Sequence, residues 1–305
     1  MRIGVMVGGS AQRLDVEALI QRARELEARG FATIWIPHVF GMDAVTAAAV
    51  VGRETERIEI GTAVVPTYPR HPTVMAQQAL TAASASGRRF SLGIGLSHPA
   101  VIEGMLGLSY ARRVSHMREY LAVLGPLLRG ETVAFDGSEF RVHETLDVPD
   151  AAPVPLLLAA LGPRMLDLAA READGTILWM AGPRTIEKHV MPRLREAATR
   201  AGRTPSRVVA GMHIALTDDP DAGHARVAEL LALYRQMPSY GALLEIEGEA
   251  DPQQMALIGD EANLEKGLRH LANLGVDDFE ASVLPLDPAT EERTLAFLAE
   301  VRVRA

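Results

Sequence analysis

The stretch RFSLGIGLSHPAVIEGMLG, residues 89–107, gives the clearest structural signal in the chain. Its apolar run at residues 90–94 is typical of a short buried strand. The loop after this strand consists of Gly95, Leu96, Ser97 and His98, and a helix-like stretch follows it. Glycine at a strand tip lets a ligand approach the backbone, and free N–H groups at a helix start can bind an anion. The stretch therefore predicts a strand–loop–helix unit whose loop contacts a ligand.

The same unit recurs along the whole chain. Strands are expected at residues 2–7, 33–37, 58–65, 90–95, 155–160, 176–180, 207–216 and 279–284. Helices are expected at residues 15–30, 43–56, 72–86, 110–128, 164–172, 184–201, 221–236, 261–274 and 289–304. Short apolar strands separated by helices indicate parallel pairing, and eight units favour a closed (β/α)8 TIM barrel. A doubly wound sheet is the alternative, but the turn after the first strand lacks the G-x-G-x-x-G spacing of a dinucleotide fold.

Two segments interrupt this rhythm. Residues 131–142 alternate polar and apolar side chains around Asp136-Gly137, which predicts a hairpin outside the main unit. Residues 238–259 show no regular pattern and are interpreted as an irregular second insertion, either a lid over the pocket or an ordinary surface loop. We therefore expect residues 1–305 to form one barrel domain with insertions near residues 131–143 and 238–260.

Composition limits the class of protein. The chain has 305 residues with 48% hydrophobic and 23% charged residues, which is ordinary for a globular protein. It contains no cysteine, so disulfides, thiolate metal sites and a cysteine nucleophile are excluded. The net charge of -8 argues against a general nucleic-acid binder. No apolar run reaches the length of a membrane span and the N-terminus does not resemble a signal peptide, so a cytoplasmic protein is expected.

The strand ends of such a barrel form the active site. Those ends are Gly8-Gly9, Pro37-His38, Ala63-Val64-Val65, Gly95 to His98, Ala160-Leu161-Gly162, Met180-Ala181-Gly182, His213 and Leu284-Pro285. They include no carboxylate and no His-x-His pair, which argues against a metal site and against a glycosidase. The two lysines, Lys188 and Lys266, fall on outer helices, which argues against a Schiff-base enzyme.

The strand ends together form the mouth of the barrel. A mouth with so few ionisable side chains suits an enzyme whose cofactor carries the reaction. Its glycines would let backbone amides approach a planar ring. Trp35, Trp179 and Met180 would provide an apolar wall. The residues therefore favour a flavin-type redox cofactor over a hydrolytic function.

Several segments of the chain are similar to those of a known protein family. They are Gly30-Phe31 with TIWIP at 33–37, RIEIGTAVVP at 57–66, RHP at 70–72, AQQA at 76–79, GRRFSLGIG at 87–95, REY at 118–120, Ala169, ADG at 173–175, and Gly211. Together they resemble the luciferase-like monooxygenase superfamily, in the branch that uses the deazaflavin coenzyme F420. Members that use FMN share most of these segments.

The resemblance implies a barrel with an insertion region, usually a homodimer, and a site at matching positions. It implies a non-proline cis peptide at Ala63-Val64 that presses on the deazaflavin ring. It places the tail phosphate after strands five and six, where the matching residues are Ala160, Leu161, Gly162, Met180, Ala181, Gly182 and Pro183, with Arg164 and Arg184 just beyond. Many relatives carry an Asp-His pair after strand two, whereas this chain reads Pro37-His38-Val39 without the carboxylate.

Each candidate side chain also has a structural interpretation. His38 is the candidate catalytic residue, with a structural polar contact as the alternative. His98 is favoured as a cofactor contact over a helix cap, and Ser97 contacts the cofactor or belongs to a turn. His71 is favoured as a structural residue of the loop-to-helix junction. For His213, a satisfied core histidine is favoured over a pocket residue.

Three functions remain open from the sequence. The first is an F420-dependent oxidoreductase that moves a hydride between the deazaflavin C5 and a small organic substrate, with His38 giving or taking a proton. The second is an FMN-dependent monooxygenase. The third is a non-catalytic barrel that binds a flavin or another ligand.

Overall fold

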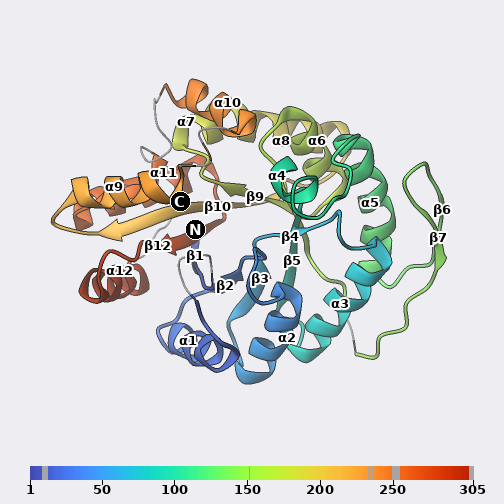
Figure 1. Cartoon of the computed structure of the whole chain (residues 1–305), viewed down its shortest axis with the longest axis horizontal. Helices are drawn as coiled ribbons and strands as arrows, with labels where there is room; N and C mark the ends of the chain where they lie inside the picture. Colours follow the sequence, from blue (N-terminus) through green and yellow to red (C-terminus); the bar gives the residue numbers. More distant parts are fainter. Residues whose placement is uncertain (9–12, 151, 233, 235–236, 249–254, 302–305) are drawn as a thin grey trace.

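A computed structural model describes residues 1–8, 13–150, 152–232, 234, 237–248 and 255–301. Eight parallel strands close into a barrel (Figure 1). In chain order they are β1 (Arg2–Met6), β2 (Thr33–Ile36), β3 (Glu59–Thr62), β5 (Phe90–Gly95), β8 (Leu156–Ala159), β9 (Gly175–Trp179), β10 (Arg207–Leu216) and β12 (Asp278–Val283). Pairing of β12 with both β1 and β10, and of β10 with β9, completes the ring. The predicted (β/α)8 barrel is confirmed.

Helices surround the barrel. They are α1 (Val16–Ala28), α2 (Ala44–Glu54), α3 (Pro72–Ala85), α4 (Pro99–Ile102), α5 (Arg113–Leu128), α6 (Pro163–Glu172), α7 (Pro183–Thr185), α8 (Met191–Arg200), α9 (Pro220–Leu230), α10 (Pro238–Glu247), α11 (Glu261–Leu274) and α12 (Pro288–Glu300). A π-helical turn, Ile186–Val190, joins α7 to α8. No helix in the described part of the chain is long and apolar enough to cross a membrane.

Aspartates fix where several helices begin. Asp15, Asp43, Asp260 and Asp287 precede α1, α2, α11 and α12, and each side chain accepts a hydrogen bond from a backbone N–H in the first turn. Such a cap satisfies a donor that the helix itself leaves free, and it is typically worth about 1 kcal/mol.

The hydrophobic core has two parts. The larger part lies between the strands and the helices. The smaller part, which we call the interior cluster, comprises Trp35, Leu157, Ile177 and Val209 from four different strands, with Met6, Ala63 and Val64 packed against it. Because successive strand residues face opposite sides of the sheet, these side chains fill the inside of the barrel.

An ion network closes the amino-terminal end of the barrel. Arg207 donates two hydrogen bonds to Asp278, at 2.8 and 2.9 Å, and one to Glu59 at 2.8 Å. Arg2 contacts the same two carboxylates. Burial alone would raise the pKa of Glu59, but the charge and hydrogen bond of Arg207, the hydroxyl of Ser91 and the charge of Arg2 together hold that pKa below its usual value. The network therefore joins β1, β3, β10 and β12 at the end opposite the strand tips.

The predicted hairpin is present and lies outside the barrel. Strands β6 (Val133–Asp136) and β7 (Arg141–Glu144) pair antiparallel in a sheet of their own and extend from one side of the molecule (Figure 1). Glu119 on α5 holds the turn, because its carboxylate accepts hydrogen bonds from the amides of residues 138, 139 and 140 and from the Ser138 hydroxyl.

The prediction of an irregular segment at residues 238–259 is wrong. Helix α10 spans Pro238–Glu247, and β11 (Leu257–Gly259) pairs parallel with β10. Proline at the first helical position and Gly248 in the left-handed conformation, with φ of 73°, mark the two ends of α10. Helix α9 also ends at Leu230, earlier than the expected residue 236.

Candidate active site

A close contact between two strand ends shapes the mouth of the barrel. The peptide bond between Ala63 and Val64 is cis, as the resemblance implies, and it separates β3 from the short strand β4 (Val65–Pro66). Gly95, the last residue of β5, lies against this unit. A β-carbon added to Gly95 would be 2.8 Å from Val64 Cγ2 and 3.2 Å from Ala159 Cβ. Glycine at this strand tip is therefore required by packing.

His38 follows β2 and is held by the start of α2. Its Nδ1 atom accepts a hydrogen bond from the Ala44 amide at 3.2 Å. Burial, followed by the positive charge of Arg70, holds the pKa of His38 below its usual value. A neutral imidazole whose Nδ1 accepts a hydrogen bond carries its proton on Nε2. His38 is therefore placed as a hydrogen-bond donor through Nε2.

A carboxylate does accompany His38, although it is not the neighbouring residue in sequence. Asp43 Oδ2 lies 3.7 Å from His38 Nδ1 and is paired with Arg70. Asp43 also caps α2 through the Thr46 amide at 2.9 Å. The segment Pro37-His38-Val39 has no aspartate beside His38, but Asp43, which caps the following helix, places a carboxylate near the His38 ring.

The loop after β5 has an uncommon backbone conformation. Ser97 has a φ of 62°, and its carbonyl accepts a hydrogen bond from the Tyr110 hydroxyl at 2.7 Å. The side chain of His98 does not cap α4, contrary to the capping alternative, and its ring lies 6.3 Å from that of Tyr234 in an edge-on arrangement. Burial lowers the pKa of His98. The His98 ring is therefore available to a ligand at the mouth.

The loop after β8 leaves open space where α6 begins. Gly162 precedes α6, and no heavy atom of the described residues lies within 4 Å of the position of a β-carbon on it. The Leu161 carbonyl contacts His189 Nε2 at 2.8 Å, which ties this loop to the π-helical turn. The loop of Ala160, Leu161 and Gly162 can thus accept an anion at the start of a ten-residue helix.

The corresponding loop after β9 is filled by the protein itself. The Glu247 carboxylate, at the end of α10, accepts hydrogen bonds from the Thr185 amide at 2.6 Å and from the Arg184 amide at 3.3 Å. A β-carbon on Gly182 would lie 2.5 Å from Glu247 Cδ. Of the predicted phosphate loop Met180, Ala181, Gly182 and Pro183, Gly182 therefore faces a carboxylate.

The predicted apolar wall is only partly correct. Trp35 is fully buried inside the barrel, where Gly61 leaves room for its indole ring, and Met180 is also fully buried. Trp179 is partly exposed and makes an edge-on contact with His213, with 5.3 Å between the ring centres. Only Trp179 of the three can line an open mouth.

His213 is a buried core histidine, as favoured from sequence, but only part of its hydrogen-bonding capacity is met, by the backbone of Ser282. Its Nδ1 atom is buried and has no hydrogen-bond partner among the described residues. Burial lowers the pKa of His213 to about 4. His71 does have the expected structural role, because its side chain accepts a hydrogen bond from the Thr73 amide and caps α3.

Sequence reasoning missed Glu280 on β12. It is fully buried, and neither carboxyl oxygen has a hydrogen-bond partner among the described residues. Glu280 is in register with Gly211, which follows the interior residue Val209 by two positions and so shares its face. Burial raises the pKa of Glu280 to about 8. The barrel interior thus contains a carboxyl group that the strand ends alone do not reveal.

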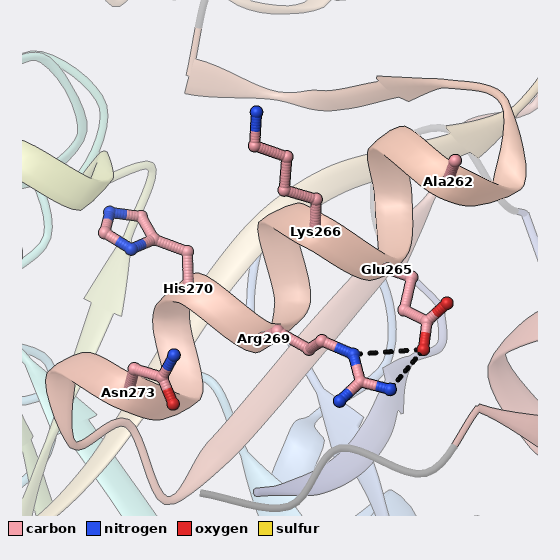
Figure 2. Close-up of a pocket in the computed structure, with 6 residues that line it drawn as sticks. All are labelled: Ala262, Glu265, Lys266, Arg269, His270 and Asn273. Carbon is pink, nitrogen blue, oxygen red and sulfur yellow. Dashed lines mark hydrogen bonds and ion pairs between the residues drawn. The ribbon is translucent and has the colours of Figure 1, made fainter.

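A hollow on the outer face of α11 differs in kind from the mouth (Figure 2). It has a volume of about 570 Å³ and is lined by Ala262, Glu265, Lys266, Arg269, His270 and Asn273. Glu265 and Arg269 pair across one helical turn, at 3.0 Å for the Arg269 Nε donor. These are the polar side chains of a solvated helix face, and Lys266 lies on an outer helix as expected.

A closed barrel with a glycine-lined, largely apolar mouth and a neutral histidine defines the class of barrels that hold a planar redox cofactor at their strand ends. The chain belongs to the luciferase-like monooxygenase family, whose model matches residues 1–278.

Relatives of known or assigned activity are similar over most of the chain. A Mycobacterium tuberculosis protein, provisionally assigned as a coenzyme F420-dependent oxidoreductase, is 31% identical over 254 residues, which are 77% of this chain and 72% of that protein. The F420-dependent glucose-6-phosphate dehydrogenase of Beutenbergia cavernae is 34% identical over 217 residues, which are 68% of this chain and 62% of that enzyme. The solved coenzyme F420-dependent tetrahydromethanopterin reductase of Methanopyrus kandleri has the same fold, with a TM-score of 0.83, 20% identity and coverage of 98% and 97% of the two chains.

Proposed function

We propose that this chain is a coenzyme F420-dependent oxidoreductase that transfers a hydride between the deazaflavin C5 and a small organic substrate. The observation that carries the proposal is the fixed, neutral imidazole of His38 at a mouth otherwise suited to a planar cofactor. The F420 dependence of sequence relatives supports the choice of cofactor.

The residues present fit such a cofactor. Ala63, Val64, Gly95, Leu96, Ser97 and His98 offer a backbone surface for the ring, and the loop of Ala160, Leu161 and Gly162 offers the acidic tail the open side ahead of α6. When bound, the deazaflavin supplies the carbon that accepts or donates the hydride.

His38 is assigned the interaction with the reacting oxygen of the substrate. With Nδ1 engaged by the Ala44 amide, its Nε2–H donates a hydrogen bond to an oxygen of the substrate. Asp43 lies near Nδ1 and is paired with Arg70. The charge of Arg70 lowers the pKa of His38, and that of Asp43 raises it. This tautomer suits reduction of a carbonyl-like oxygen, because the Nε2–H hydrogen bond stabilises the negative charge that develops on that oxygen, and the proton that the oxygen finally takes comes from water.

Titration of the purified protein with F420 and, separately, with FMN tests the proposal by fluorescence and absorbance. Tight F420 binding is expected, together with turnover of reduced F420 in the presence of a carbonyl substrate. Tight FMN binding without F420 binding would overturn the proposal in favour of a monooxygenase. Binding without turnover of any carbonyl substrate would favour a ligand-binding barrel.

The sequence further suggests a cytoplasmic protein and the resemblance a homodimer, and we include both in the proposal. Light scattering coupled to size-exclusion chromatography is expected to give twice the chain mass of 32.9 kDa. Fractionation of cells that produce the protein checks its compartment.

A further inference from the structure

Helices α6 and α7 begin with the same three residues. Gly162-Pro163-Arg164 follows β8, and Gly182-Pro183-Arg184 follows β9. Both glycines have an extended backbone, with φ and ψ of -81° and 154° at Gly162 and -72° and 172° at Gly182. Neighbouring strands of the barrel therefore end in two loops of matching sequence and backbone conformation.

The two loops differ in what faces them. The space beside Gly162 holds no heavy atom of the described residues within 4 Å of a β-carbon position, and Gly162 is exposed. The space beside Gly182 holds the carboxylate of Glu247, a side chain with 5% relative exposure. The anion that the second loop binds is thus part of the same chain.

Several contacts hold Glu247 in place. Its oxygens accept from the Thr185 and Arg184 amides, and Arg184 Nη1 donates back to the Glu247 carbonyl at 2.6 Å. Helix α10 ends at Glu247, and Gly248 turns the chain away in the left-handed conformation. The donors that a phosphate would use at this loop are consequently engaged by a carboxylate with a fixed backbone.

We propose that Glu247 is a specificity-determining residue that keeps phosphate groups out of the β9–α7 loop and disfavours cofactors with a phosphate monoester. The inference rests on the proposed function, because it requires that the phosphate of a bound cofactor lies near the loops after β8 and β9. A monoester such as that of FMN carries close to two negative charges at neutral pH. The phosphodiester of F420 carries one. Repulsion from a buried carboxylate a few ångströms away is therefore greater for FMN.

A comparison of FMN with riboflavin isolates the contribution of the phosphate to the binding free energy. Dissociation constants for FMN and riboflavin, which share the ring and differ in the phosphate, are measured for the native chain, E247Q and E245Q. Glu245 is exposed on the same helix and serves as the matched control for charge. We expect E247Q to tighten FMN binding by about tenfold or more, with riboflavin binding unchanged and E245Q like the native chain.

An unchanged ratio of FMN to riboflavin affinity in E247Q would overturn the proposal, as would weaker FMN binding. F420 affinity is measured alongside. If F420 does not bind but the ratio rises as expected, the proposed function fails and the role of Glu247 stands. If F420 binds and the ratio does not rise, the role of Glu247 fails and the proposed function stands.

Inorganic phosphate gives a test that needs no flavin. The backbone amides of Arg184 and Thr185 are followed by NMR during a phosphate titration. Their signals are expected to stay unchanged in the native chain and to shift in E247Q. Shifts of both amides in the native chain would show that phosphate displaces Glu247, and no shift in E247Q would show that the loop does not bind phosphate; either result overturns the proposal.

Discussion

Glu280 and Gly211 are neighbours on adjacent strands, and Glu280 Oε2 lies 2.7 Å from the position that a β-carbon on Gly211 would take. Gly4, on the other adjacent strand, is also in register with Glu280. The carboxyl group thus lies between two residues without side chains, inside the barrel.

The first prediction concerns stability against pH. The folded-state pKa of Glu280 is raised by burial from 4.5 to about 8, so its contribution is complete below the unfolded pKa and is lost as pH rises through about 8. Between the unfolded pKa of 4.5 and the folded pKa of about 8, the free energy of unfolding falls by about 1.4 kcal/mol per pH unit. Chemical denaturation from pH 4 to 9 should show this decline in the native chain and a flatter profile in E280Q. Parallel profiles would show that Glu280 does not titrate in this window.

The second prediction concerns His38. Replacing it with alanine should lower kcat by about 10² to 10³ because the hydrogen-bond donor to the reacting oxygen is lost. The cofactor dissociation constant should change little. Steady-state kinetics and a binding titration give the two numbers, with H143A on the exposed hairpin as the control. Equal kcat in H38A and the native chain would remove His38 from the mechanism.

The neutral state of His38 also has a pH consequence. Its pKa is lowered mainly by burial and then by Arg70, so the neutral form persists below pH 6.5. A turnover that needs the neutral Nε2–H form should therefore hold its rate until the pH falls below 6.5. A rate that falls off above that pH would indicate a different titrating group.

The third prediction concerns the hairpin anchor. Burial favours the neutral form of Glu119, yet the amides of residues 138–140 and the Ser138 hydroxyl lower its pKa to about 2. E119Q should lower the free energy of unfolding by about 2–3 kcal/mol, since charged hydrogen bonds are lost. Hydrogen exchange should accelerate at residues 138–140. E144Q on the hairpin itself is the control and should leave exchange at the turn unchanged.

The fourth prediction compares two glycines at the mouth. G95A places a β-carbon against Val64 and Ala159 and should destabilise the fold by about 1–3 kcal/mol. G162A meets no described atom and has an extended φ, so its stability should stay within about 0.5 kcal/mol of the native chain. Thermal or urea unfolding measures both. Equal stability of the two variants would contradict the packing argument at Gly95.

The strands could be predicted because each is a short apolar run between polar turns. Buried parallel strands require this pattern, and β5 and β10 were found with their observed bounds. Helix α10 was missed because its apolar residues do not fall on one face, although Pro238 and Gly248 mark its ends. The Gly9 end of the first strand lies outside the described residues.

The site was predictable where it depends on position along a strand, and not where it depends on distant partners. His38, Gly95 and Gly162 follow strands and were expected at the mouth. Glu247 contacts Thr185 across 62 residues of sequence, and no local pattern indicates that pairing. Glu280 lies in a strand where polar and apolar residues alternate, and which of its two faces points inward follows only from the register with Gly211.

The ion network at the amino-terminal end of the barrel has a consequence for folding order. Asp278 receives hydrogen bonds from Arg207, 71 residues earlier, and pairs with Arg2 near the other end of the sequence. Contacts of such long sequence separation form late, because the loop between the partners must first be closed. During synthesis, β1 has no partner on its β12 side until residue 278 has left the ribosome. Its unpaired edge is therefore open to aggregation until then.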